Sequence, residues 1–480
     1  MKKIDRNNWL KIGLIIVSII FLLPSAFFFI NNKSAFNFNG NLEFCFLLTE
    51  NIRRSTQTGV YFVILCLFVL FYYLILKKRK ILFKTEKSVY KYIFCIGLIF
   101  VFVMPFWCSD IFYYLGVGRL GGYYHQNPYY TDIKTYFDNN PDIDLTNDSL
   151  MQKGYNNYWA NTTVVYGPIW TIICTIISLL SFGNLDVGLL IFKIINLMIH
   201  MGNCYFLYKL SKNKIFPLMY GLNPFILIEG IANVHNDIFV VFFMVLSIFF
   251  LLKKKNLILS LLSLALATDI KYFSILLLPL LVLYKYRDEK IKKRILRCVE
   301  YGILYGVFVI IPYLFYIRDK DVFLGLVTQR ERISKGLYLI ISMRVQDSEN
   351  IILNLKKFSL LTFAICYALN CIILLVNKNI KFYKEIRCIY GFVLVFLFFL
   401  LTNFQPWYFM WLSIFMIWQK SQNIKLLLQI QILTLIANLK FLMYSESFEN
   451  GCDFFKIFII GIALCIILNS KKIKGLMRRK

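Results

Sequence analysis

The chain has 480 residues, of which 59% are hydrophobic and 18% aromatic. Soluble domains contain only about 45–50% apolar residues, so this composition excludes an ordinary water-soluble protein. The formal net charge is +28, but the basic residues lie in short clusters between long apolar runs, for example at 77–80, 285–297 and 471–480. This positive-inside pattern reports membrane orientation, so the charge predicts a lipid bilayer and no nucleic acid as partner.

Apolar runs long enough to cross a bilayer recur along the whole chain. They predict an all-α polytopic membrane protein with about 12–14 transmembrane helices. Both ends of the chain are basic, which predicts cytoplasmic N- and C-termini in a plasma-membrane protein. The expected organisation is an N-terminal helix pair with a basic loop (1–91), a catalytic transmembrane module (92–297) and C-terminal transmembrane helices (298–480).

The first helices should run outward at 10–30, inward at 59–76 and outward again at 92–107. The following segment, 108–163, contains five Asp residues after residue 130 and few bases, so it is expected to be a long external loop. Loops of this length are usually functional or contain their own helices. Short juxtamembrane helices are therefore predicted within it.

The middle of the chain contains one topological conflict. Lysines at 209, 212 and 214 indicate an inner end, which leaves the apolar run 166–182 starting and ending on the outer side. Either this run is re-entrant or peripheral, which we favour, or the lysine cluster breaks the positive-inside rule. The run 257–284 is interrupted by Thr-Asp-Ile-Lys, and its two inner ends predict a pair of short helices with Asp269 and Lys271 at the external tip.

The C-terminal part follows the same alternation. A second external segment is expected at 318–357, and the remaining membrane segments are predicted at 298–317, 360–376, 387–401, 406–418, 424–443 and 453–469. In this scheme, polar residues from four separate loops arrive at the external face: Asp110 and Arg119, His235 and Asp237, Asp269 and Lys271, and Gln405 with Trp407 and Tyr408. Polar groups that converge from several helix ends are typical of a ligand pocket in a helical bundle.

Each candidate also has a plainer interpretation. Asp110 could be a catalytic base or could only cap the next helix, because Ser109-Asp110 precedes an apolar run. Arg119 could bind a phosphate or anchor the chain at the membrane interface. His235 and Asp237 could be a helix start, and their spacing alone is too loose to assign a metal site.

Two further candidates are similarly open. Lys271 could bind a phosphate, or it could form a salt bridge with Asp269. Trp407 and Tyr408 have the composition of an aromatic belt at the membrane interface.

Several motifs occur in a characteristic order: GRLGGYYHQNPY at 118–129, YGP at 166–168, NPFILIEGIANVHND at 223–237, ATDIKY at 267–272 and QPWY at 405–408. In this order, and with Asp110 after a membrane helix, the chain resembles the GT-C superfamily of polyprenyl-phosphate-dependent glycosyltransferases. It is most similar to the polyprenol-phosphate-mannose mannosyltransferases. The resemblance extends over roughly residues 92–418 and implies an inverting hexosyltransferase of cell-envelope biogenesis.

The resemblance implies a role for each residue. Asp110 matches the acid that activates the acceptor hydroxyl, and Asp237 matches a second acid in the same site. Lys271 matches the basic residue that holds the lipid phosphate. The other residues expected at the donor phosphate and sugar are Arg119, Tyr113, Asn127, Tyr166, His235, Gln405, Trp407 and Tyr408. Relatives often carry two acids close together after the first helix, where Asp110 stands alone here. No metal ligand set is therefore assigned, and a divalent metal stays an open question.

The predicted function is transfer of a hexose, with mannose favoured, from a polyprenyl-phosphate donor to an extracytoplasmic glycan or glycolipid acceptor. A lipid-linked sugar flippase or transporter is the alternative from another class, although it should show two pseudo-symmetric halves. A polysaccharide polymerase or ligase is closer, because 318–357 carries Arg330, Arg332 and Arg344. A purely structural membrane protein is the third class.

Overall fold

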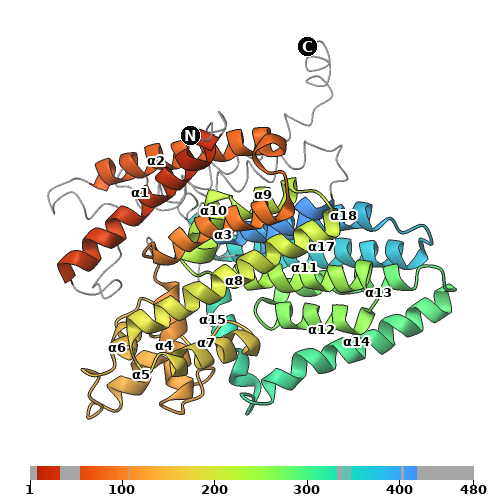
Figure 1. Ribbon diagram of the computed structural model, residues 1–480. Helices are drawn as coiled ribbons and strands as arrows, with labels where there is room; N and C mark the ends of the chain where they lie inside the picture. The colour runs from red at the N-terminus through yellow and green to blue at the C-terminus, as the bar shows by residue number, and fades with distance from the viewer. Residues whose placement is uncertain are drawn as a thin grey trace. The chain divides into compact units, whose positions relative to one another are not determined.

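The computed structural model describes residues 8–32, 54–105, 108–331, 338, 341–342, 345, 348–401 and 405–418. These residues form helices and turns without any strand, which confirms the all-α polytopic membrane fold (Figure 1). The membrane segments predicted at 424–443 and 453–469 and the basic tail lie outside the described residues, as do Arg332 and Arg344. The predicted total of 12–14 membrane helices therefore stays a prediction.

The chain divides into two compact units. The first contains 1–242 and 312–326, and the second contains 243–311 and 327–480. Helices of the first unit are α1 (Asn8–Asn32), α2 (Arg54–Leu82), α3 (Glu86–Phe102), α4 (Asp110–Gly122), α5 (Ile133–Asp138), α6 (Ser149–Tyr155), α7 (Pro168–Leu180), α8 (Leu185–Ser211), α9 (Ile215–Gly221), α10 (Pro224–Ile226), the π-helix η1 (Leu227–Ala232) and the 3₁₀ turn η3 (Lys320–Phe323). Helix α11 (Asp237–Lys253) continues from the first unit into the second.

The second unit contains the remaining helices. They are α12 (Leu257–Thr268), the 3₁₀-helix η2 (Tyr272–Leu277), α13 (Leu278–Lys285), α14 (Ile291–Tyr313), α15 (Leu324–Glu331), α17 (Ser348–Val376), α18 (Phe382–Val395), the π-helix η4 (Phe396–Leu400) and the 3₁₀-helix η5 (Pro406–Trp418), with the ends of α14 and α15 in the first unit. The three-part organisation predicted from membrane topology is a different kind of division and stays a prediction.

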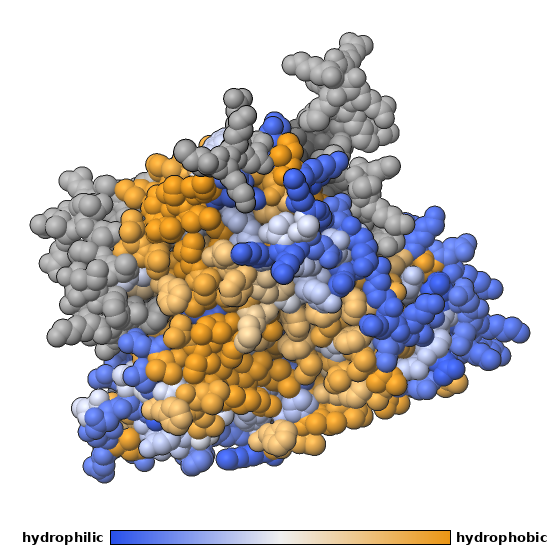
Figure 2. Space-filling view, in the orientation of Figure 1, coloured by the Kyte–Doolittle hydropathy of each residue, from blue (hydrophilic) through white to orange (hydrophobic). Residues whose placement is uncertain are grey.

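Among the described residues, four helices are long and apolar enough to span a membrane: Val60–Leu82, Leu185–Ser211, Ile291–Tyr313 and Glu349–Val376. The pair Ile215–Gly221 and Pro224–Ala232 is bent by 49° and counts as a fifth span if it is read as one broken helix. Large hydrophobic side chains are exposed on the four long helices, whereas the bent pair is almost entirely buried. Figure 2 shows apolar areas on the visible face. Such exposed apolar area is what lipid contact requires.

Two of the short segments follow the sequence analysis. The run 257–284 forms two short helical pieces, with Asp269 and Lys271 in the turn between α12 and η2, as predicted. Helix α7 has 13 residues, which corresponds to about 20 Å and is too short for a hydrocarbon core of about 30 Å. Its length agrees with the re-entrant or peripheral interpretation of 166–182.

The third helix differs from its predicted bounds of 92–107. It starts at Glu86, where the Thr85 side chain accepts a hydrogen bond from the Ser88 N–H, and it ends at Phe102. The expected basic loop at 77–91 is largely helical, because α2 continues to Leu82. Lys and Arg are good helix formers and are favourable in a last turn, so a basic cluster does not end a helix.

The acidic loop 108–163 contains the predicted short helices, namely α4, α5 and α6. Two of its acids are helix caps: the Asp132 carboxylate accepts from Thr135 N–H, and the Asp148 carboxylate accepts from Met151 N–H. Helix α4 packs closely on α6 and α7 (Figure 1). A Cβ atom at Gly118 would lie 2.2 Å from the Cys174 carbonyl oxygen, so only glycine permits the α4–α7 approach.

We predict that Gly118→Ala lowers the free energy of unfolding by about 1–3 kcal/mol, because the new methyl group must push apart two backbones. Gly302→Ala is the matched control, since no atom lies within 4 Å of the added Cβ in that helix. Thermal unfolding of both variants in one detergent measures the difference. Equal melting temperatures would contradict the close α4–α7 contact.

Candidate functional site

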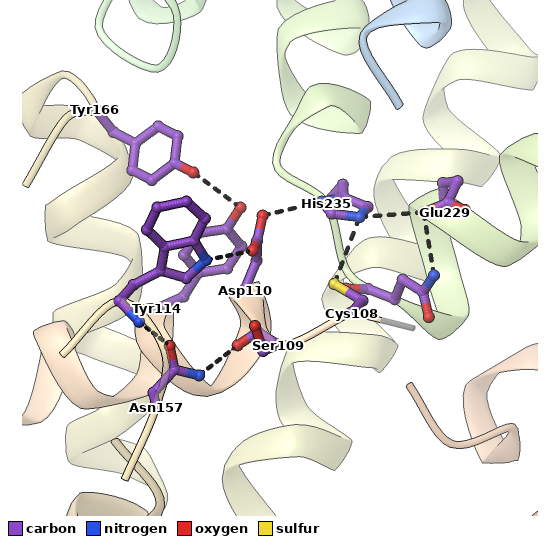
Figure 3. A network of polar contacts seen from close by, with 10 residues as sticks. Cys108, Ser109, Asp110, Tyr114, Asn157, Tyr166, Glu229 and His235 are labelled. Carbon is purple, nitrogen blue, oxygen red and sulfur yellow. Dashed lines mark hydrogen bonds and ion pairs between the residues drawn. The ribbon is translucent and has the colours of Figure 1, made fainter. Parts of the chain in front are cut away.

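Asp110 is the first residue of α4 and is 9% exposed. Its Oδ1 accepts a hydrogen bond from Trp159 Nε1 at 3.1 Å, and its Oδ2 lies 3.7 Å from His235 Nδ1 (Figure 3). The start of a helix stabilises negative charge. Ser109, not Asp110, occupies the cap position and makes no side-chain capping bond. Asp110 therefore faces an indole and an imidazole, which is more than a helix cap requires.

The loop after α6 holds Trp159 in place. Asn157 Nδ2 donates to the Ser109 carbonyl at 2.8 Å, and Asn157 Oδ1 accepts from the Trp159 backbone N–H at 2.8 Å (Figure 3). One amide side chain thus connects the start of α4 to the residue that donates to Asp110. This connection positions the carboxylate without using its second oxygen.

His235 is completely buried behind Asp110. Its Nε2 lies 3.1 Å from Glu229 Oε2 and 3.5 Å from Cys108 Sγ. Burial alone would lower the pKa of His235, but the neighbouring Cys108 and Glu229 outweigh it and raise the pKa to about 10. At neutral pH, His235 is therefore protonated and lies between the carboxylates of Glu229 and Asp110.

The backbone that carries Glu229 and His235 is irregular. Glu229 lies on the π-helix η1, and its backbone carbonyl accepts the His235 N–H at 2.9 Å. Between them, Val234 has φ 58°, a left-handed conformation that is costly for a β-branched residue. π-Helical turns and strained residues are concentrated at functional sites. The strain here presents the imidazole to Asp110.

Lys193 of α8 connects the chain segment that leads to Asp110 with the segment that leads to His235. Its buried Nζ donates to the Val103 carbonyl at 2.6 Å and to the Ala232 carbonyl at 2.5 Å. Val103 follows α3 on the way to Asp110, and Ala232 ends η1 on the way to His235. Sequence reasoning missed both Lys193 and Glu229, although an ionisable residue inside an apolar run is itself a signal.

Tyr166 and Tyr113 flank the network from α4 and its neighbours. The Tyr166 hydroxyl lies 3.3 Å from that of Tyr114, and Figure 3 shows this pair beside Asp110. The Tyr113 hydroxyl donates to the Thr162 carbonyl at 3.0 Å. Tyr113 therefore supports the loop, and binding of the donor by Tyr166 or Tyr113 stays a prediction.

Other predicted residues have different surroundings. Asp237 is completely buried in the first turn of α11. Asn127 Nδ2 donates to the Tyr316 carbonyl at 2.7 Å and its Oδ1 accepts from the Tyr129 N–H. This arrangement connects the loop after α4 to residues after α14, and the sugar contact of Asn127 stays a prediction.

Arg119 lies nine residues after Asp110, about 13 Å farther along α4, and does not join the network. Its Nε is 2.7 Å from Asp148 Oδ2, both side chains are buried, and the guanidinium covers the Tyr123 ring at 3.9 Å. Tyr124 donates to the same carboxylate oxygen. These partners account for Arg119 without a ligand, so phosphate binding by Arg119 stays a prediction.

The second unit holds an aromatic and cationic cluster. Lys271 Nζ lies 4.4 Å from the ring centroid of Tyr408 and 5.4 Å from that of Trp411. The two rings stack at 4.8 Å, and Phe273 stacks on Trp411 at 3.7 Å. The structure thus brings together Lys271 and Tyr408, whereas the sequence analysis did not single out Trp411 or Phe273.

Gln405 and Trp407 are buried at the start of this aromatic segment. Trp407 contacts Tyr408 edge to face at 6.3 Å. Asp269 is also buried, and neither of its carboxylate oxygens has a hydrogen-bond partner among the described residues. Burial raises the pKa of Asp269 to about 8. The unpaired carboxylate of Asp269 does not match the salt bridge between Asp269 and Lys271, which was the alternative to phosphate binding.

A family model for the N-terminal domain of alpha-(1->6)-mannopyranosyltransferases matches residues 30–287, more than half of the chain. The chain belongs to this family. The matched region contains Asp110, Glu229, His235 and Lys271, and it starts earlier and ends earlier than the predicted resemblance over 92–418. Comparisons with curated proteins and with solved structures give no significant match. Family membership confirms the predicted resemblance and identifies a membrane glycosyltransferase.

We predict that Arg119→Gln mainly destabilises the fold, because removing one partner of a buried ion pair costs about 3–5 kcal/mol. Donor binding by the folded fraction should stay unchanged. The control is Arg287→Gln, which removes a solvent-exposed pair with Asp288 and should cost at most about 1 kcal/mol. Thermal unfolding and donor binding of both variants test this assignment. If Arg119→Gln keeps wild-type stability but loses donor binding, Arg119 binds the donor directly.

Proposed function

We propose that the protein transfers mannose from a polyprenyl-phosphate donor to a hydroxyl group of a cell-envelope glycan or glycolipid on the extracytoplasmic face, with Asp110 as general base. The observation that carries the proposal is the buried network of Asp110, His235 and Glu229 within the region matched by the family model. A carboxylate at this depth is costly unless it is used or paired.

The reaction assigns one task to Asp110. Asp110 accepts the proton of the acceptor hydroxyl while the hydroxyl oxygen forms a bond to the anomeric carbon of mannose. The bond from that carbon to the phosphate oxygen breaks, and polyprenyl phosphate leaves with the bonding electrons. A single displacement of this kind inverts the anomeric configuration. Proton removal by a positioned base contributes typically about 10²–10⁴-fold to such a reaction.

His235 and Glu229 support this role from behind. The imidazolium lies against Asp110 Oδ2, and Glu229 with its Asn233 contact holds the opposite ring nitrogen. The carboxylate is thereby oriented at two points, by His235 and by Trp159. Asp110 Oδ1, which accepts the indole hydrogen bond at 3.1 Å, keeps a second lone pair that is suited to an incoming hydroxyl proton.

The donor side of the proposal rests on the cluster around Lys271. A lipid phosphate needs a cation, and Lys271 supplies a compact charge beside the faces of Tyr408 and Trp411. Aromatic faces also suit the apolar face of a sugar ring. The external compartment lacks nucleotide sugars, and the sequence carries no nucleotide-binding fingerprint. Both points favour a lipid-linked donor over a nucleotide sugar.

We predict that Asp110→Asn lowers mannose transfer by about 10²-fold or more, because the amide keeps size and polarity but cannot accept the proton. Donor binding should be largely retained. Asp144→Asn is the matched control, since Asp144 is an exposed acid in the same loop. Turnover of polyprenyl-phosphate mannose by the two variants is the measurement. Wild-type turnover in Asp110→Asn would reduce Asp110 to a structural residue.

A separate prediction concerns the donor phosphate. Lys271→Ala should weaken donor binding by about 2–5 kcal/mol, because a desolvated charge loses its partner. Lys271→Arg keeps the positive charge but replaces a compact ammonium with a planar guanidinium, so it should recover only part of the lost donor affinity. Lys254→Ala, an exposed lysine of the same unit, is the control. Equal donor affinity in all three variants would rule out Lys271 as the phosphate ligand.

A further inference from the structure

Three residues of different chemistry meet at the start of α4. Cys108, Asp110 and His235 each offer one ligand atom, and these atoms all lie within 4.8 Å of one another. The shortest separations are 3.5 Å from Cys108 Sγ to His235 Nε2 and 3.7 Å from Asp110 Oδ2 to His235 Nδ1. These two distances end on different ring nitrogens, and the set with one ligand atom per residue spans up to 4.8 Å. Neighbouring ligands of a tetrahedral zinc ion, with bonds of about 2.0–2.3 Å, lie about 3.3–3.8 Å apart, so the three residues must move closer to bind one.

Further residues contact these three side chains from outside and hold them in position. Glu229 is 1% exposed on its side chain and lies on the far side of His235, while Trp159 holds Asp110. Residues that contact a ligand from outside orient it and fix its charge. The nearby buried Lys193 already donates to two backbone carbonyls. His235 must lose its extra proton before it can bind a metal, so the ion replaces the positive charge of the imidazolium between the carboxylates.

We propose that Cys108, Asp110 and His235 bind a thiophilic divalent cation of the zinc class. A thiolate and an imidazole together select zinc over magnesium or calcium, which prefer oxygen ligands. Only one ring nitrogen of His235 can take part, so a small rotation of the imidazole accompanies binding. Three protein ligands leave the fourth tetrahedral position for a water molecule or a hydroxyl.

The cation would have two effects on the site at Asp110. Bound through Oδ2, it holds the carboxylate and leaves Oδ1, beside Trp159, for a proton. It also places positive charge where the acceptor oxygen arrives. This role rests on the proposed function, whereas the binding itself does not. Because Cys108 precedes α4 and His235 lies 127 residues farther along the chain, no local spacing in the sequence marks the site.

Cobalt is the probe, because a thiolate bound to Co²⁺ gives an intense charge-transfer absorption in the near ultraviolet. The purified, metal-stripped full chain is titrated with Co²⁺ without donor or acceptor. We expect one equivalent to produce this band, and Zn²⁺ to abolish it by displacement. Cys108→Ser should remove the band, and Cys174→Ser should keep it, because Cys174 is a buried free cysteine outside the cluster.

The outcomes distinguish a failure of the cation proposal from a failure of the proposed function. No band in the wild-type chain, or a full band in Cys108→Ser, overturns the proposal. Should Cys108→Ser fail to fold, Asp110→Asn is titrated instead, and an unchanged Co²⁺ affinity there overturns it, since loss of one ligand should weaken binding at least about 10-fold. A chain that binds Co²⁺ but transfers no mannose contradicts only the proposed function.

Discussion

The buried side chain of Lys193 is the constraint on which the geometry of the site depends. It binds the carbonyls of Val103 and Ala232, which lie at the ends of two elements far apart in sequence. Each of these ends leads directly to one member of the pair Asp110 and His235. A fully buried amino group that donates to two carbonyls is costly to leave unpaired, so these hydrogen bonds keep the two chain ends in register.

The strained backbone is explained by the same constraint. A π-helical turn and the left-handed Val234 are each unfavourable alone, and they persist where the surrounding structure determines them. Here the turn allows Glu229 to contact His235 through both its carbonyl and its carboxylate. Local backbone strain thus accompanies a site in which an imidazole, a thiol and two carboxylates lie close together.

Much of the fold could be predicted from the sequence, because apolar runs and charge clusters are local signals. They predicted the hairpin around Asp269, the helices inside the acidic loop and the short α7. The candidate site was predictable only in part. Asp110 and His235 stand at helix ends, where polar residues are visible in the sequence. Glu229 lies in a largely apolar stretch of the sequence, and only tertiary contacts reveal its partner. Likewise, the ion pair of Arg119 could not be predicted, because Asp148 lies 29 residues away.

The most direct test of the central claim is a donor comparison with the purified full chain in lipid nanodiscs. The chain is incubated with labelled polyprenyl-phosphate mannose or with nucleotide-activated mannose, and with cell-envelope lipoglycan acceptors. The account predicts mannose transfer from the lipid-linked donor alone, with stoichiometric release of polyprenyl phosphate. Release of polyprenyl phosphate without mannosylated acceptor, or transfer from the nucleotide sugar alone, would contradict it.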